Sequence, residues 1–187
     1  MPDWARIATR SRVPLGFLFA AAYLWWARPA WPSLLAGSAI ALVGIMIRAV
    51  ASGYIRKNAE LATTGPYAYT RNPLYLGSIV IALGFIVAAR NFWIGAAAAA
   101  MFAFVYLPVI RAEEKYLRTA FPDYADYAGH VPRLLPRLTA FRPGATTEGA
   151  GRNFSTELYR RHREYNAALG SVLMMGALIL KMLLVQR

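Results

Sequence analysis

The chain of 187 residues contains no cysteine and only two histidines, His130 and His162. Without cysteine there is no disulfide framework, thiolate zinc site, covalent haem attachment or prenylated C-terminus. The two histidines are isolated from each other in the sequence, so we expect no metal centre. The redox compartment stays undetermined, because cysteine usage is what would have indicated it.

Charged residues are also scarce, at 16% of the chain, whereas 58% of the residues are hydrophobic and the mean hydropathy is +0.36. This composition is too apolar for an ordinary soluble domain and indicates a membrane protein. The net charge of +12 is high enough to suggest nucleic-acid binding. However, the Lys and Arg residues fall between long apolar runs rather than on one amphipathic face, so we expect no nucleic-acid partner.

Apolar runs long enough to cross about 30 Å of hydrocarbon occupy residues 13–28, 33–54, 73–89, 91–110 and 166–185. They predict an all-α polytopic membrane helical bundle of about five transmembrane helices in a single domain, 1–187. The first run follows three arginines, as a secretory signal would. No polar cleavage region follows it and Trp25, Trp26 and Trp31 resemble an interfacial belt, so we interpret it as a retained span.

The basic residues are distributed asymmetrically between alternate loops. Sixteen of the 21 Lys and Arg precede the first run or lie in residues 55–72 and 111–165, against three on the other side. The positive-inside rule therefore predicts that the N-terminus and both large loops are cytoplasmic. Arg48 and Lys181 remain inside apolar runs, and for both we expect the side chain to reach toward the membrane surface. For Arg48, contact with an anionic substrate or a lipid headgroup is the alternative.

The third and fourth runs are separated only by Arg90 and Asn91, which predicts a tight antiparallel hairpin. Its two ends would return together to the cytoplasmic surface, so that residues 71–77 and 111–118 become neighbours within the cytoplasmic catalytic segments 56–77 and 111–140. Residues 141–153, with Pro, Gly and Thr, indicate a flexible linker. Ser155 and Glu157 are expected to begin a basic helix over 158–165 that leads into the last run.

Segment 64–77 is richer in special residues than a plain connector requires. Its Gly65 and Pro66 fix a turn, and Pro73 suits the first turn of a helix, where a missing N–H costs nothing. Tyr67, Arg71 and Asn72 provide polar groups beside that turn. A helix start with interfacial tyrosines is the simpler structural interpretation of the segment alone.

Segment 111–118 begins where the fourth run ends, and it carries Arg111, Glu113, Glu114 and Arg118. Adjacent glutamates lie about 100° apart on a helix, so at most one faces a given site. Glu114 and Arg118 form a favourable i, i+4 pair. A solvated helix end is therefore the simpler interpretation of this cluster.

Together, the two segments resemble the integral membrane methyltransferases that include isoprenylcysteine carboxyl methyltransferase and the phospholipid N-methyltransferases. That family shares Gly-Pro-Tyr, then Arg-His-Pro-x-Tyr-x-Gly, a membrane hairpin and a Glu-Glu pair. This chain has Gly-Pro-Tyr at 65–67, Arg-Asn-Pro-Leu-Tyr-Leu-Gly at 71–77 and the Glu pair at 113–114. The tyrosine-rich stretch 116–127 and Val-Pro-Arg-Leu-Leu-Pro at 131–136 are similar to the region after the Glu pair in bacterial members.

The resemblance implies methyl transfer from S-adenosylmethionine, bound at the cytoplasmic face, to a lipid-like or prenylated substrate of the isoprenylcysteine carboxylate type. Phospholipid N-methylation is the alternative. It implies a bacterial or archaeal inner-membrane enzyme with a lipid or lipid-like partner, and it leaves the oligomeric state open. The implied cofactor-binding residues are Tyr67, Arg71, Asn72, Tyr75, Gly77, Glu113, Glu114, Leu134, Leu135 and Pro136.

The residue chemistry agrees with this implication. Arg71 and Asn72 can donate to the cofactor's carboxylate, and a glutamate can accept from its ammonium group. The candidate catalytic residues are Arg71, Arg111, Glu113 and Glu114, and the candidate substrate-binding residues are Arg48 and Arg118. A carboxylate acceptor would need a nearby cation, whereas an amine would need a base to remove its proton.

Asn72 stands where the family usually has His. An amide still donates a hydrogen bond but never titrates, so we expect this position to hold the cofactor rather than to act as a base.

Two other classes of function compete with the enzyme. A small transporter would need ionisable groups along its path, and the five apolar cores hold no Asp, Glu or His. A non-enzymatic membrane scaffold would use the same motifs as structure, and failure to bind S-adenosylmethionine would favour it.

Overall fold

The computed structural model describes residues 4–56, 59–142 and 153–185, and their side chains from residue 14 onward. Within these ranges the regular structure is helical and no strand is present. Three helices have the length and hydropathy needed to cross a membrane: Trp31–Ser52, the continuous helical run Phe92–Ala120, and Tyr165–Val185. The predicted class of polytopic helical membrane protein is therefore confirmed.

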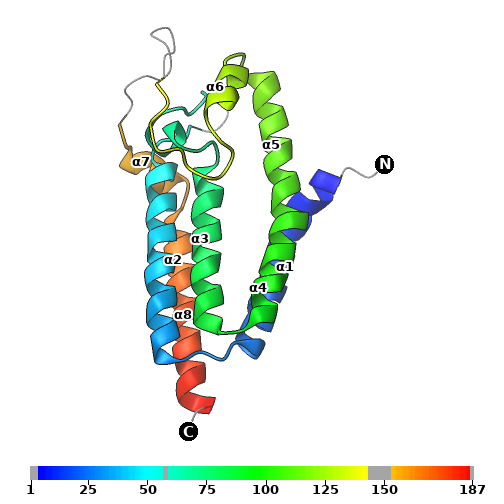
Figure 1. Cartoon of the computed structure of the whole chain (residues 1–187), viewed down its shortest axis with the longest axis vertical. Coiled ribbons are helices and arrows are strands. Elements are labelled where there is room, and N and C mark those ends of the chain that lie inside the picture. Colours follow the sequence, from blue (N-terminus) through cyan, green and yellow to red (C-terminus); the bar gives the residue numbers. More distant parts are fainter. Residues whose placement is uncertain (1–3, 57–58, 143–152, 186–187) are drawn as a thin grey trace. The chain divides into compact units, whose positions relative to one another are not determined.

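The elements in chain order are α1 (Trp4–Trp26), α2 (Trp31–Ser52), the 3-10 turn η1 (Gly65–Ala68), α3 (Pro73–Ala89), α4 (Phe92–Met101), the π-helical segment η2 (Phe102–Tyr106), α5 (Leu107–Ala120), α6 (Tyr124–His130), α7 (Thr156–Arg161) and α8 (Tyr165–Val185) (Figure 1). Each of the five apolar runs coincides with a helix. The apolar parts of α1, Pro14–Trp26, and of α3, Pro73–Ala89, are shorter than the other three. Five membrane crossings therefore stay a prediction.

The predicted turn between the third and fourth runs is confirmed. α3 ends at Ala89 and α4 begins at Phe92. Between them, Arg90 has φ +50°, and the Asn91 side chain accepts a hydrogen bond from Trp93 N at 2.9 Å. Asn91 therefore caps α4 and satisfies one of the free N–H groups at the start of that helix.

The fourth run continues without a break through η2 into α5. Pro108 explains the π-helical turn before it, because proline has no N–H to donate and its ring crowds the carbonyl four residues earlier. The helix widens locally at η2 and then resumes. The apolar run ends at residue 110, whereas the helix extends to Ala120.

The contacts divide the chain into two compact units. Unit 1 comprises Met1–Ala41, Ala82–Lys115 and Gly170–Arg187, and unit 2 comprises Leu42–Ile81 and Tyr116–Leu169. The boundaries fall inside helices α2, α3, α5 and α8, so the chain passes between the units within continuous helices. A single domain over 1–187 stays a prediction.

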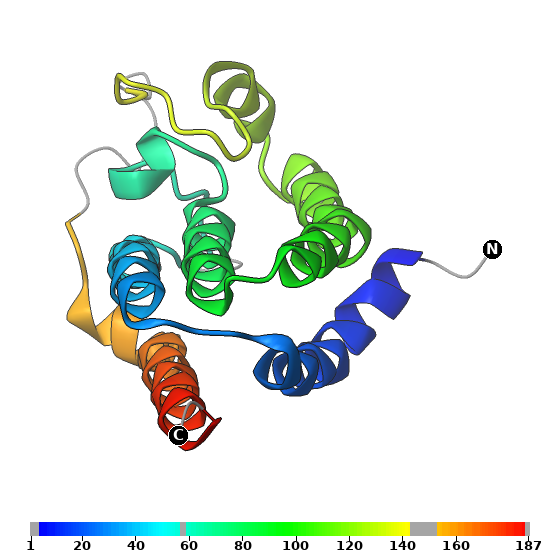
Figure 2. The ribbon, with the colours of Figure 1, turned by 60° about the horizontal axis from the view of Figure 1, so that its bottom comes forward.

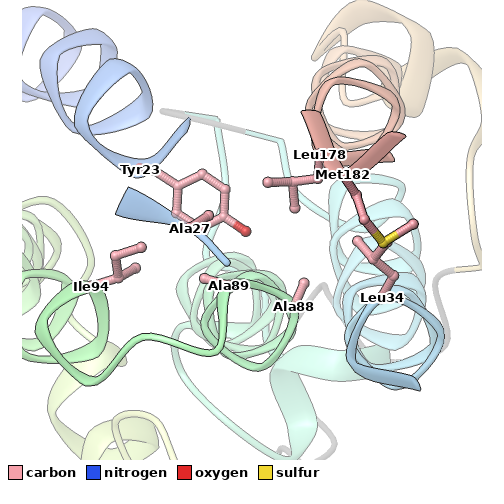
Figure 3. Packing of buried hydrophobic residues seen from close by; sticks show 8 residues of the cluster. All are labelled: Tyr23, Ala27, Leu34, Ala88, Ala89, Ile94, Leu178 and Met182. Atoms are coloured by element: carbon pink, nitrogen blue, oxygen red, sulfur yellow. The ribbon is translucent and has the colours of Figure 1, made fainter. Parts of the chain in front are cut away.

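Unit 1 has an apolar core where α1, α2, α3, α4 and α8 contribute side chains. Figure 3 shows Leu178 and Met182 of α8 facing Tyr23 of α1 and Leu34 of α2, with two small alanines of α3 beside them. The Tyr23 hydroxyl donates to the Phe85 carbonyl at 2.9 Å, so the phenol does not leave a polar atom unsatisfied in this core.

Lys181 has a more specific role in unit 1 than the snorkelling we expected. Its ammonium group donates to the carbonyl oxygens of Leu24, Trp25 and Ala27 at 2.7, 2.8 and 2.7 Å. These carbonyls lie at the C-terminal end of α1, where the helix leaves carbonyls without backbone partners. α8 therefore caps α1.

α2 and α3 pack through glycines, and Figure 2, which shows the helices nearly end-on, places them side by side. In unit 1, a Cβ on Gly84 would lie 2.5 Å from the Gly37 carbonyl oxygen. In unit 2, a Cβ on Gly77 would lie 2.8 Å from the Gly44 carbonyl oxygen. No real Cβ makes contacts this short, so glycine lets the two backbones approach.

Unit 2 has its own core in the polar half of the sequence. Tyr124, Tyr127 and Val131 are buried, and partly buried apolar side chains from five other positions pack on them: Leu61, Leu117, Phe121, Ala128 and Phe141. Ser155 caps α7 through Leu158 N, as expected, but α7 ends at Arg161 and a turn separates it from α8. Most of the predicted linker, residues 143–152, lies outside the described residues.

Candidate functional site

The turn at η1 is built by glycine and two prolines. Gly65 has φ +58°, and a Cβ there would lie 2.6 Å from the ring of Tyr54, so only glycine fits. Pro66 follows inside η1, and Pro73 opens α3. This local chemistry places Tyr67, which is 5% exposed, inside unit 2 and directs Arg71 and Asn72 just ahead of α3.

Segment 132–141 runs beside this turn and is held by backbone hydrogen bonds. Arg71 N donates to the Pro132 carbonyl, Arg137 N to the Tyr69 carbonyl, and Phe141 N to the Ala68 carbonyl, each at 2.9 Å. The structure therefore brings Leu134, Leu135 and Pro136 beside the turn and Arg71, as expected from the sequence. Leu135 is 79% exposed.

Side chains add to this contact. The Thr70 hydroxyl lies 3.0 Å from the Leu134 carbonyl oxygen and 3.2 Å from that of Arg133. Asn72 Nδ2 donates to the same Arg133 carbonyl at 3.1 Å. This donor therefore holds the neighbouring loop, and a contact of the Asn72 amide with the cofactor stays a prediction.

Tyr127 of α6 connects the core of unit 2 to the turn. Its hydroxyl donates to the Tyr67 carbonyl at 2.7 Å. Burial raises the pKa of the Tyr127 phenol, and the neighbouring Tyr124 raises it further, while the nearby Arg71 guanidinium lowers it. The phenol therefore stays protonated at neutral pH and keeps donating this hydrogen bond.

The remaining candidates on α3 have different surroundings. Tyr75 is half-buried, one turn after Arg71. Gly77 is buried in the contact with α2, where a Cβ would lie 2.6 Å from Arg48 Cγ. The structure thus gives Gly77 a packing role that the motif alone did not separate from cofactor binding.

Arg111, Glu113 and Glu114 lie on α5, in the part that belongs to unit 1. Glu114 is 6% exposed, whereas Arg111, Glu113 and Lys115 are exposed. The sequence left open which glutamate faces inward, and the structure identifies Glu114. The meeting of this pair with Arg71 stays a prediction, because Arg71 belongs to unit 2.

The two candidate substrate-binding arginines have partners within unit 2. Arg48 donates through Nε and Nη2 to Glu164 Oε2, at 3.0 and 2.7 Å. Arg118 lies over the Tyr124 ring, 5.6 Å from its centroid. Arg48 is thus an ion-paired residue, and its contact with a substrate stays a prediction.

Sequence reasoning missed Glu164, Thr70 and Ser78. A signal for Glu164 was present, since an arginine inside an apolar helix requires an anion and Glu164 immediately precedes an apolar helix. No signal pointed to the Thr70 hydroxyl, because its partners are backbone carbonyls far along the chain. Among the described residues there is no group of three or more His, Cys, Asp or Glu that could hold a metal ion.

Comparison with known proteins gives one family match. The family model described as phospholipid methyltransferase matches residues 31–124, half of the chain. This region contains α2, the η1 turn, α3 and the glutamate pair. No solved structure matches the chain.

Two curated relatives are similar over 91 residues, which are 49% of this chain. The cobalt-zinc-cadmium resistance protein CzcN of Cupriavidus metallidurans is 40% identical, and the match covers 42% of its length. The nickel-cobalt-cadmium resistance protein NccN of Alcaligenes xylosoxydans xylosoxydans is 41% identical, with 43% of its length covered. The match thus spans less than half of each relative.

Proposed function

Because the chain belongs to the phospholipid methyltransferase family, we propose that it transfers a methyl group from S-adenosylmethionine to a lipid-like acceptor in the membrane. The observation that carries this proposal is the built turn at residues 65–72, which is held to segment 132–141 by hydrogen bonds from backbone and side chains. A simple connector between helices would not need segment 132–141 to hold it in place.

The residues present fit the cofactor's amino-acid end, which carries one carboxylate and one ammonium group. We propose that Arg71 binds the carboxylate, since a guanidinium offers several donors in a fixed fork. We propose that Glu114 binds the ammonium group, because a carboxylate accepts charge-assisted hydrogen bonds from such a group and Glu114 is the buried member of the glutamate pair, at 6% exposure. Tyr67, Tyr75, Leu134, Leu135 and Pro136 complete the proposed cofactor-binding set.

The remaining candidate residues receive other roles. We assign Asn72 and Gly77 to positioning, and Arg111 and Glu113 to the exposed margin of the site. Asn72 fixes the loop carbonyl of Arg133, and Gly77 sets the distance between α3 and α2.

When bound, the cofactor supplies an electrophilic methyl carbon on a sulfonium. The chain's own residues then bind and orient the cofactor and the acceptor and shield them from water. Most of the barrier reduction in such a displacement comes from alignment of the reacting groups and exclusion of water. A carboxylate acceptor, of the isoprenylcysteine type, is already deprotonated and can attack the methyl carbon without a base. A phospholipid amine must first lose a proton, so an acceptor of that kind would also need a base in the site.

A methyl-transfer assay tests the proposal and the acceptor together. Purified protein would be incubated with methyl-labelled S-adenosylmethionine and either total membrane lipid or a prenylcysteine analogue. We expect label in one of the two organic extracts, and much less label with a Glu114→Gln variant at the same concentration of S-adenosylmethionine. Absence of both methyl transfer and cofactor binding would favour the scaffold class instead.

The names of the two relatives carry a second candidate role, in tolerance of divalent metals. Expression of the chain in a metal-sensitive bacterium would test it by growth in cobalt, zinc and cadmium. Tolerance that is lost in Glu114→Gln would link the role to methyl transfer, whereas tolerance that persists would separate the two.

A further inference from the structure

The C-terminal segment 154–164 lies beyond the family match, which ends at residue 124, yet it is attached to unit 2. At its start, Phe154 packs where a Cβ on Gly53 would be, and its ring contacts Tyr54 edge-on with 6.4 Å between centroids. Ser155 N donates to the Gly53 carbonyl at 3.0 Å. The segment is therefore fixed at the end of α2.

The second attachment is the ion pair between Arg48 and Glu164. One carboxylate oxygen accepts from both Nε and Nη2, and the two side chains are 22% and 12% exposed. An arginine in an apolar helix is costly unless it is paired, so Glu164 is what allows Arg48 to remain in α2.

Arg48 also reaches the beginning of α3. Its Nη1 donates to the Leu74 carbonyl at 3.1 Å and to the Ser78 hydroxyl, which itself donates to the Leu74 carbonyl at 3.0 Å. Leu74 and Ser78 lie in the first two turns of α3, directly after Arg71. A chain of hydrogen bonds thus runs from Glu164 through Arg48 to the segment that carries the proposed cofactor residues.

The backbone just before Glu164 is unusual. Arg163 has φ +53°, a conformation that residues other than glycine adopt rarely and at a cost. Its N–H donates to the Arg160 carbonyl at 3.0 Å, and its carbonyl accepts from Asn166 N at 3.0 Å. This corner turns the chain from α7 into α8 and sets the position from which Glu164 reaches Arg48.

We propose that Glu164 is a positioning residue of the methyl-transfer site: by holding Arg48, it fixes the first two turns of α3 and, with them, Arg71 and Tyr75. The inference rests on the proposed function, and it makes the C-terminal segment 154–164 a support of the methyl-transfer site. It also assigns Arg48 to α3 and Glu164 rather than to an anionic substrate.

The first test needs no cofactor. Hydrogen-deuterium exchange of the full chain in detergent would compare the wild type with Glu164→Gln, which removes the charge at nearly constant shape. We expect faster exchange in peptides covering residues 74–82, and little change in a Glu157→Gln control, which removes an exposed charge on α7. Unchanged exchange at 74–82, or a change confined to α8, would overturn the inference.

The second test measures S-adenosylmethionine binding by the same proteins. We expect Glu164→Gln to weaken binding by about tenfold, as small displacements of binding groups do, and Glu164→Asp to recover part of it. If Glu164 acts through Arg48, the double variant Arg48→Gln/Glu164→Gln should lose no more than the Arg48→Gln single variant. Additive losses, or wild-type affinity in Glu164→Gln, would contradict this route.

The two tests separate the inference from the proposed function. A wild type that binds no S-adenosylmethionine overturns the proposed function, together with the role of Glu164 in it, whatever the exchange data show. A wild type that binds, beside a Glu164→Gln variant that binds equally well, overturns the inference alone.

Discussion

Glu113 and Glu114 are neighbours on α5 but differ in exposure, and this difference gives a prediction for cofactor binding. Glu114 is 6% exposed and Glu113 is exposed. Because a hydrogen bond to a charged group contributes about 1.5–3 kcal/mol, we expect Glu114→Gln to raise the dissociation constant of S-adenosylmethionine roughly 10- to 100-fold. Glu113→Gln should change it by less than about fivefold, the upper end of the range for an exposed ion pair. Isothermal titration calorimetry would measure both.

The Glu113→Gln variant is the matched control, since it removes the same charge one residue away. Equal loss in the two variants would mean that the charge of the pair, rather than the buried position, governs binding. If both variants keep the wild-type affinity for S-adenosylmethionine, neither glutamate belongs to the cofactor site.

Lys181 gives a prediction for stability that is independent of function. Its ammonium group donates to three carbonyls at the end of α1. Lys181→Met keeps the length and loses these donors, so we expect the free energy of unfolding to fall by about 1.5–3 kcal/mol. Unfolding in mixed detergent micelles would measure it. The exposed Leu180→Met on the same helix is the control, and a Lys181 variant as stable as this control would contradict the capping role.

At the scale of elements, the close approach of α2 and α3 depends on glycine. A Cβ at Gly84 would lie 2.5 Å from the Gly37 carbonyl oxygen and 2.7 Å from Ala41 N, and backbone atoms cannot give way as a side chain can. We therefore expect Gly84→Ala to destabilise the protein by about 1–3 kcal/mol, the usual cost of overpacking. The same unfolding assay measures it.

Gly176 in α8 provides the matched control, because nothing lies within 4 Å of a Cβ placed there. Alanine is about 0.8–1.0 kcal/mol better than glycine inside a helix, so Gly176→Ala should not lose stability and can gain it. Equal effects at Gly84 and Gly176 would show that the α2–α3 contact does not require glycine.

The sequence predicted the apolar helices well because each of the five runs is long and ends at polar or turn-forming residues, whereas the short polar helix α6 was not predicted. Arg90 and Asn91 are an example, since only two residues separate two such runs. The π-helical segment η2 and the extension of α5 to Ala120 were not predicted. Hydrophobicity does not report a local change in helical pitch, and α5 beyond Arg111 is too polar to be recognised as part of a span.

The candidate site was predicted less completely, because partners that are distant in sequence leave little local signal. The motif residues of unit 2 do come together with Leu134, as expected. The donor of Asn72 and the packing of Gly77 follow from contacts with Arg133 and Gly44, which no spacing rule specifies. Arg48 shows the same limit, since its need for an anion was readable but the choice of Glu164 was not.

At the scale of the whole molecule, the orientation in the membrane follows from charge. Sixteen Lys and Arg fall in the N-terminal part and the two large loops, against three in the alternate positions. By the positive-inside rule, such a bias predicts that the basic loops are cytoplasmic, where S-adenosylmethionine would be available. We propose this orientation in a bacterial or archaeal inner membrane, and the absence of cysteine makes it directly measurable.

Single-cysteine variants would report the orientation without background labelling. Leu138 is 99% exposed in the loop after α6, and the exposed Arg28 lies in the turn between α1 and α2. In inverted membrane vesicles, we expect a membrane-impermeant maleimide to label Leu138→Cys and to spare Arg28→Cys. Right-side-out vesicles should give the reverse. Labelling of Leu138→Cys from the outer side would place the proposed site away from its cofactor supply and overturn both the topology and the cytoplasmic assignment of the enzyme.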